Sequence, residues 1–210
     1  MADKTTLKPD KRSLITEAAI DVFAEKGFHQ ARISDVASRA GVADGTIYLY
    51  FKNKDDLLLS IFEEKMDYML AGLSRALNRI HDPIQQIREF ARFHFEQVQT
   101  HRAAAEVLQV ELRLSNKFIK EYRPEKFWAY LGVLGQIIRE GQAKGVFHES
   151  LDPFITMWAF FGALDELAMQ WILARKTQRF QLEEAAAQVA EVFLRGMTSQ
   201  SLNPNPSEEP

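Results

Sequence analysis

The stretch "GVADGTIYLYFKNK", residues 41–54, decides how the N-terminal part of the chain is interpreted. It begins with a glycine, carries three aromatic residues and contains two lysines. Gly41 suits a tight turn because glycine adopts positive φ angles at little steric cost. Apolar residues at helical spacing lie before and after that turn, so the pattern predicts short helices over 34–40 and about 44–50.

A third predicted helix completes this N-terminal unit. Apolar residues recur at helical spacing from Asp10 to Lys26, and Gly27 follows as a stop. Three helices within about 50 residues predict a compact helix-turn-helix domain over residues 8–56. In such a motif the second helix of the pair enters the major groove of DNA.

The faces of the predicted recognition helix follow from its spacing. Ile47 and Phe51 are four residues apart and are expected to face the core. The residues then turned toward DNA are Gly45, Thr46, Tyr48 and Lys52. The Thr46 methyl group suits a thymine methyl group, while Tyr48, Tyr50 and Lys54 suit phosphate oxygens.

Charge does not by itself select this interpretation. The chain has 26 basic and 29 acidic residues and a net charge of −3, and its first 60 residues carry nine of each sign. A DNA surface must therefore be a local patch. The same spacing also fits a tight helical hairpin inside an ordinary core.

The segment "AAIDVFAEKGFHQARISDVASRAGVADGTIYLYFKNKDDLL" resembles the DNA-binding domain of the TetR family of bacterial regulators, with the likeness covering about residues 10–58. The resemblance implies three helices for DNA, then about six for a ligand and dimerisation, and DNA contacts at Thr46, Tyr48 and Lys54. One departure is Ala31–Arg32, where the family often has two threonines. We expect Ser34 to cap the second helix and Arg32 to take over the phosphate contact.

The rest of the chain is predicted to be all-α, with about nine helices in the whole protein. Hydrophobic residues make up 46% of the 210, enough for a substantial core. We expect an effector-binding and dimerisation domain over 57–198 and a disordered tail over 199–210. The helices that follow the N-terminal unit are predicted over 54–80, 83–100, 103–115, 120–144, 152–174 and 182–197.

The cellular setting is also predicted from composition. The chain has no cysteine, and its N-terminus shows no apolar export signal, so a cytoplasmic location is expected. Its longest apolar stretch carries Asp165 and Glu166, which argues against a membrane partner.

Large apolar side chains on several helices predict a ligand tunnel, although such residues also form ordinary cores. The candidate tunnel residues are Phe90, Phe93, Trp128, Leu131, Trp158 and Phe161. A basic cluster suits an amphipathic ligand with an anionic head, although it could equally be a solvated face. It comprises Arg113, Lys117, Lys120 and Arg123.

The stretches "QVELRLSN" and "GALDEL" with the recognition segment look similar to the FadR branch of the family, which regulates fatty-acid degradation. That resemblance implies release from DNA by long-chain acyl-CoA, with the basic cluster holding the CoA phosphates and the tunnel holding the acyl chain. The alternatives are a repressor that responds to a drug or another hydrophobic compound, and a helical lipid carrier or enzyme.

Two helices are predicted to form a homodimer. The helix over 152–174 is apolar on nearly all sides, which predicts burial on both faces. The last helix would join it at a two-fold interface. Its predicted contact residues are Leu182, Ala185, Ala186, Val189, Ala190 and Phe193.

Catalysis and metal binding are not predicted. The sequence has no nucleophile or phosphate-binding motif, so no catalytic residue is assigned and the protein is not expected to be an enzyme. His94 and His101 lack the companions of a metal set and are interpreted as structural; no cofactor is expected.

Overall fold

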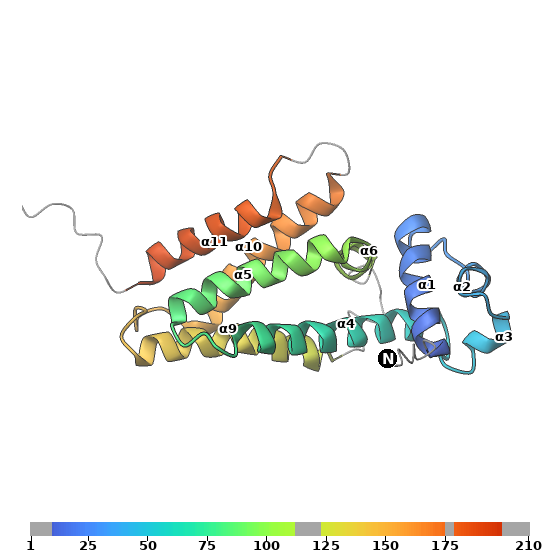
Figure 1. Cartoon of the computed structure of the whole chain (residues 1–210), viewed down its shortest axis with the longest axis horizontal. Helices are drawn as coiled ribbons and strands as arrows, with labels where there is room; N and C mark the ends of the chain where they lie inside the picture. The colour runs from blue at the N-terminus through green and yellow to red at the C-terminus, as the bar shows by residue number, and fades with distance from the viewer. Residues whose placement is uncertain (1–9, 112–122, 175–178, 199–210) are drawn as a thin grey trace, which may run out of the picture. The chain divides into compact units, whose positions relative to one another are not determined.

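The computed structural model describes residues 10–111, 123–174 and 179–198, and its regular elements there are helices (Figure 1). They are α1 Lys11–Lys26, α2 Ile33–Ala40, α3 Asp44–Ile47, α4 Lys54–Leu77, α5 Pro83–Thr100, α6 Arg102–Glu106, the π-helix η1 Val107–Glu111, α9 Glu125–Ala143, α10 Pro153–Leu173 and α11 Leu182–Met197. An isolated β-bridge joins Phe147 to Thr198. The predicted all-α class is confirmed.

The helices fall into two compact units. The first contains α1, α2, α3, the start of α4, α6 and η1, and the second contains the end of α4 with α5, α9, α10 and α11. The division within α4 lies between Tyr68 and Met69. One continuous helix therefore belongs to both units.

In the first unit, glycines end the helices that precede the recognition segment. Gly27, with φ +77°, caps α1, and Gly41, with φ +68° in the left-handed region, caps α2. The Val42 amide then donates to the Ala37 carbonyl across 3.0 Å, which closes the end of α2. This bond fixes the direction in which the chain enters α3.

The start of α2 differs from the prediction. The helix begins at Ile33, and the carboxylate of Asp35 accepts the Arg32 amide at 2.9 Å. Ser34 therefore lies inside the first turn and makes no capping bond, so its predicted capping role is wrong. An acceptor three residues into the helix has satisfied the free amide instead.

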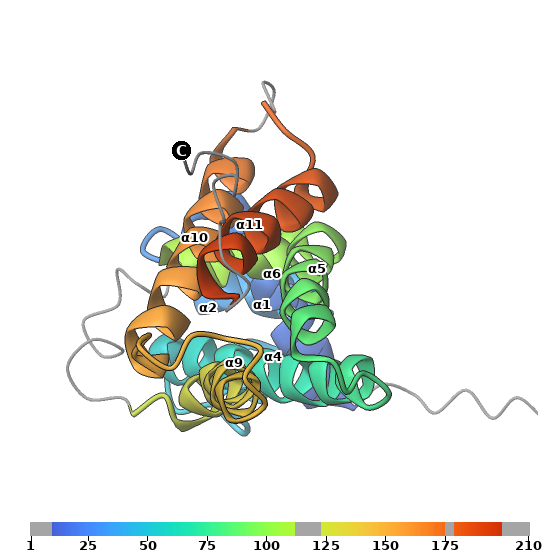
Figure 2. The same ribbon diagram turned by 90° about the vertical axis from the view of Figure 1, so that its left-hand side faces the viewer.

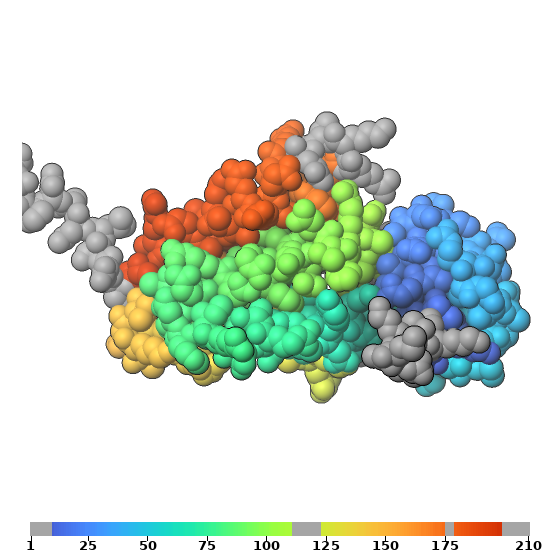
Figure 3. All heavy atoms as spheres, viewed as in Figure 1, coloured from blue at the N-terminus to red at the C-terminus, as the bar shows by residue number. Residues whose placement is uncertain are grey.

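In the second unit, α5, α9, α10 and α11 surround a common interior (Figure 2). The surfaces of α5 and α11 adjoin along their length in the space-filling view (Figure 3). The largest completely buried side chains of this interior are Phe90, Phe95, Tyr130, Phe147 and Phe160. Among the described helices, none has the length and apolarity needed to cross a lipid bilayer.

Three predicted helix boundaries differ from the structure. α4 ends at Leu77 and not at residue 80. The helix predicted over 103–115 begins as α6 and continues as the π-helix η1. The helix predicted from residue 120 is described from Glu125 onward. The tail predicted to be disordered, 199–210, lies outside the described residues.

Candidate nucleic-acid interface and effector interior

The recognition helix is shorter than predicted, but its faces are as expected. α3 covers only Asp44–Ile47, and residues 48–50 form a turn. The amides of Leu49 and Tyr50 donate to carbonyls three residues back, which tightens the chain there. Ile47 and Phe51 are both buried, as their spacing predicted.

The opposite side of α3 is open to a partner. Gly45 has no heavy atom within 4 Å of where a β-carbon would lie, and Thr46 is half-buried. Tyr48 is 57% exposed and Leu49 is 81% exposed. Small residues within the helix and large exposed residues just after it therefore share one open surface. Tyr50 is also exposed beside them.

Lys54 has a structural role that the sequence did not suggest. Its Nζ donates to the carbonyls of Phe28 at 2.6 Å, Ala31 at 2.9 Å and His29 at 3.3 Å. The same nitrogen lies 4.6 Å from the centre of the Phe28 ring. All three protons of the ammonium are therefore used within the unit. The predicted contact of Lys54 with DNA stays a prediction. A DNA phosphate would have to compete with these three carbonyls for the ammonium group.

Four basic side chains of the first unit form ion pairs within it. Salt bridges join Lys26 to Asp35 at 2.8 Å, Arg39 to Glu25 at 2.7 Å, Lys65 to Glu17 at 2.8 Å, and Arg12 to Glu64. The bond from Lys26, followed by the Arg32 amide, holds the pKa of the Asp35 carboxyl below its usual range. These pairs partly neutralise the positive charge that the unit could present to a polyanion.

Arg32 and Lys52 are two basic side chains that these pairs do not include. Both are exposed, and no ion pair with a described residue holds either side chain. Arg32 precedes α2, and Lys52 follows the turn after α3. In the sequence they therefore lie at the two ends of the helix-turn-helix.

In the second unit, aromatic rings form a connected path between α9 and α10. Trp128, 47% exposed, contacts Trp158 with 5.6 Å between ring centres. Trp158 contacts Phe161 at 6.2 Å, and Phe161 contacts His94 at 5.7 Å. The path runs from exposed rings to a buried imidazole.

His94 is a polar group in this apolar interior. Its Nδ1 lies 3.1 Å from the Tyr130 hydroxyl, and its ring also contacts Phe95. Burial lowers the pKa of His94 to about 4, against a smaller opposing effect of the Asp165 charge. The imidazole is thus neutral near pH 7, and its buried Nε2 has no hydrogen-bond partner in the described part of the chain.

The other predicted ligand residues divide into three groups. Phe90, Phe93 and Leu131 are buried in the unit, where Phe90 packs against Tyr130 with 5.1 Å between ring centres. Arg123 is exposed. Arg113, Lys117 and Lys120 lie outside the described residues. Ligand contact by all of these residues stays a prediction.

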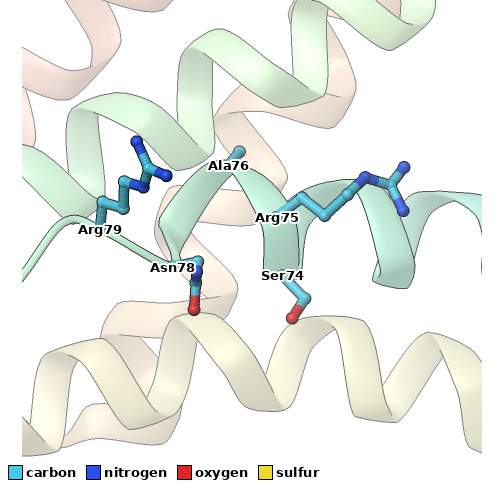
Figure 4. A pocket seen from close by; sticks show the side chains of 5 residues that line it. All are labelled: Ser74, Arg75, Ala76, Asn78 and Arg79. Carbon is cyan, nitrogen blue, oxygen red and sulfur yellow. The ribbon is translucent and has the colours of Figure 1, made fainter.

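A shallow hollow lies at the end of α4 (Figure 4). Its lining is Ser74, Arg75, Ala76, Asn78 and Arg79. In the close-up, the two arginine side chains extend on the side away from Ser74 and Asn78. Because every lining residue comes from one short stretch of chain, this hollow is a surface feature with no enclosing wall.

A more apolar groove lies between α10 and α11. Its lining residues are Ala163, Leu167, Phe180, Glu184, Ala185, Gln188, Val189, Val192 and Phe193. Val192 on α11 is 70% exposed. The apolar character extends along α10, where Phe154, Ile155 and Leu173 are exposed in the single chain. The predicted burial of both faces of this helix, one of them against a partner chain, stays a prediction.

The predicted dimer residues of α11 need a correction. Leu182, Ala185, Ala186 and Ala190 are buried within their own subunit, so they offer little surface to a partner. Val189 and Phe193 remain partly exposed and line the groove with Val192. The spacing identified an apolar helix face correctly but did not distinguish its inner side from its outer side.

No three metal-ligating side chains gather within the described ranges. The ring of His101 packs edge-on against Tyr68, 5.4 Å away. The sequence reasoning missed the Lys54 anchor and the unpartnered nitrogen of His94. A histidine among phenylalanines in "FARFHFEQ" was the available signal for the second.

An exposed short helix, set by a left-handed glycine turn beside a second helix, defines a helix-turn-helix protein, here with an added helical unit. The chain belongs to the tetR family of bacterial regulatory proteins, whose sequence model matches residues 15–61. A second model, described as the C-terminal region of YsiA-like protein, matches residues 62–196.

Similar proteins include regulators of fatty acid metabolism. The Fatty acid metabolism regulator protein of Bacillus subtilis (strain 168) is 35% identical over 190 residues, which cover 90% of this chain and 97% of that protein. The fatty acid degradation regulator FadR from Bacillus halodurans is 36% identical, with a TM-score of 0.83 over 91% of this chain and 98% of that one. FadR from Bacillus subtilis in complex with stearoyl-CoA is 35% identical, with a TM-score of 0.82 over 88% and 98%.

Proposed function

We propose that this protein is a transcriptional repressor of fatty-acid degradation genes that long-chain acyl-CoA releases from DNA. The observation that carries the proposal is the open surface of α3 on a chain of this family, with exposed Arg32 and Lys52 at the two ends of the helix-turn-helix in the sequence. Direct base contact falls to Gly45 and Thr46, because their small side chains allow close approach. Tyr48, Tyr50, Arg32 and Lys52 bind phosphates and fix the orientation.

The proposed effector is an acyl thioester. It is supported by the likeness to a FadR solved with stearoyl-CoA and by the aromatic path from Trp128 to Phe161. An acyl chain buried among such rings is stabilised by the apolar surface removed from water. Trp128 and Trp158 lie at the exposed end of the path, where the chain would enter.

The proposed working form is a cytoplasmic homodimer that uses the groove between α10 and α11 as its interface. A dimer presents two recognition helices to half-sites about 34–36 Å apart, or a multiple of that distance. Acyl-CoA causes release if it binds better to the dimer whose recognition helices are spaced incorrectly for the operator.

Titration of a labelled operator tests the proposal. The operator is first selected from random duplexes with the pure protein, and binding is followed by fluorescence anisotropy. We expect salt-dependent binding that stearoyl-CoA reverses at micromolar concentration. Free CoA and a shorter acyl-CoA are the matched controls. If only unrelated hydrophobic compounds release the bound operator, the fatty-acid assignment is contradicted. If the protein selects no duplex from the random pool, DNA recognition is contradicted.

A further inference from the structure

Two buried polar atoms on α5 have no hydrogen-bond partner in the described part of the chain. They are Nε2 of His94 and Oε1 of Gln97, which lie close together in the sequence, whereas a third such atom on this helix, Oε1 of Gln86, lies about two turns earlier. The two residues are three positions apart, so their side chains leave the helix on the same side. A folded protein pairs most of its buried polar groups, because an unmade bond costs free energy. Two such atoms within one turn point to something that completes them.

The hydrogen-bonding role of His94 follows from its neighbour. Burial raises the pKa of the Tyr130 phenol, so the hydroxyl keeps its proton. His94 is the hydrogen-bond partner of that hydroxyl in the described structure. A phenol that keeps its proton can donate it to Nδ1, and we adopt this arrangement for the proposal that follows; it places the imidazole's own proton on Nε2. His94 thus presents an unused N–H donor.

Gln97 contributes a hydrogen-bond acceptor, where His94 contributes a donor. Its Oε1 is an acceptor, so the pair offers one donor and one acceptor. A hydroxyl group is the smallest organic group that both accepts and donates a hydrogen bond. A saturated methylene chain satisfies neither atom.

We propose that His94 and Gln97 recognise a hydroxyl group on the acyl chain of the effector, so that the protein prefers a hydroxyacyl thioester to the saturated one. The inference rests on the proposed function and specifies its ligand. The ring path supports it, since Phe161 contacts both Trp158, nearer the surface, and His94. A chain that follows these rings arrives at the imidazole.

Calorimetry with ligands of equal chain length tests the preference. The probes are stearoyl-CoA and a positional series of hydroxystearoyl-CoAs, with the hydroxyl near the thioester, at mid-chain and beyond it. We expect at least one isomer to bind wild-type protein about tenfold more tightly than stearoyl-CoA, equivalent to about 1.4 kcal/mol. Equal affinity for the whole series overturns the inference.

Three variants show whether these atoms are responsible. His94→Phe and Gln97→Met should each reduce the hydroxyl preference to about twofold or less while stearoyl-CoA binding persists. Gln99→Met is the matched control, because Gln99 is exposed on the same helix, and it should keep the full preference. Should His94→Phe unfold, as judged by its thermal melt, Gln97→Met still decides the matter. A preference that survives Gln97→Met overturns the shared site.

The failures of the two proposals are distinguishable. If wild-type protein binds none of the thioesters, the proposed effector class is wrong and this inference falls with it. If stearoyl-CoA binds and releases DNA but no hydroxylated isomer binds more tightly, only the hydroxyl inference is overturned. In that second case we expect a buried water molecule to be the hydrogen-bond partner of His94 Nε2 and Gln97 Oε1.

Discussion

At the scale of single residues, Lys52 and Lys54 are two residues apart and have different roles. The Lys54 ammonium is bonded to three carbonyls of the 28–31 loop, whereas Lys52 is exposed. Lys54→Met keeps an apolar stem but removes those bonds. We expect it to lower the free energy of unfolding by about 2 kcal/mol, since hydrogen bonds to a charged group are worth about 1.5–3 kcal/mol net. Denaturant titration measures this change.

Lys52→Met is the matched variant. It should leave stability nearly unchanged and lower the slope of log affinity against log salt by about one, as expected for one lost phosphate contact. Equal loss of DNA affinity without loss of stability in both variants would show that Lys54 serves DNA and not the fold.

His94 predicts how stability depends on pH. Its pKa falls from 6.5 to about 4 on burial, so the unfolded chain binds a proton more readily than the folded one between these values. Stability should therefore decrease as the pH falls from about 6.5 to about 4, and this residue should account for about 3 kcal/mol of the loss. Thermal or urea unfolding at a series of pH values measures the effect.

The comparison for this pH effect is His94→Phe, which should remove that part of the loss. The exposed residue His148 supplies a control variant, His148→Gln, which should keep the wild-type profile. Parallel profiles for the wild-type protein and His94→Phe would contradict the role given to burial.

The spacing of residues predicted which side chains face the core better than it predicted the hydrogen-bond partners of a side chain. The four-residue spacing of Ile47 and Phe51 placed both in the core correctly. The partners of Lys54 were not predictable, because its carbonyl acceptors lie 23 to 26 residues earlier in the chain. A lysine beside a recognition helix fits phosphate or backbone oxygen equally well by chemistry alone.

At the scale of elements, two glycines of α9 predict opposite effects of the same substitution. A β-carbon on Gly141 would approach the Phe147 ring unrealistically closely, whereas Gly132 has nothing within 4 Å. Gly141→Ala should destabilise by about 1–3 kcal/mol because the loop after α9 must move. Gly132→Ala should stabilise by about 0.4–1 kcal/mol, since it reduces the entropy of the unfolded chain. Denaturant titration of both variants gives the comparison, and a stable Gly141→Ala protein would contradict the described packing.

Helix boundaries were predictable where local chemistry sets them. Pro83 begins α5 and Asp152 caps α10, with its carboxylate accepting the Phe154 and Ile155 amides at 2.8 and 3.0 Å. The π-helix η1 was not predictable, because a wider turn leaves no mark in the apolar spacing of five residues. The start of α2 was misassigned because Ser34 and Asp35 are both suitable acceptors and only one is used.

At the scale of the whole molecule, the sequence pattern predicted the class and the two kinds of unit, but not which side of α11 is outermost. Alanine suits both a tight interior contact and a partner contact, so Ala186 and Ala190 were assigned to the wrong side. Only the packing of α11 on α5 separates the two possibilities. The outer side instead carries Val192 beside the groove with α10.

That outer side supplies the test of the proposed dimer. Val192→Glu places a charge on the apolar groove and, by two-fold symmetry, places it there twice. The free-energy cost of burying an unpaired carboxylate exceeds the free energy gained from the apolar contact between subunits. We therefore expect light scattering to show a folded monomer. Affinity for a full operator should fall about a hundredfold, since each recognition domain then binds without the other. Ala129→Glu, exposed on α9, is the matched control and should remain dimeric with unchanged affinity. A dimeric Val192→Glu protein would place the interface on another face, and a monomer that keeps full affinity would mean that the operator needs only one recognition helix.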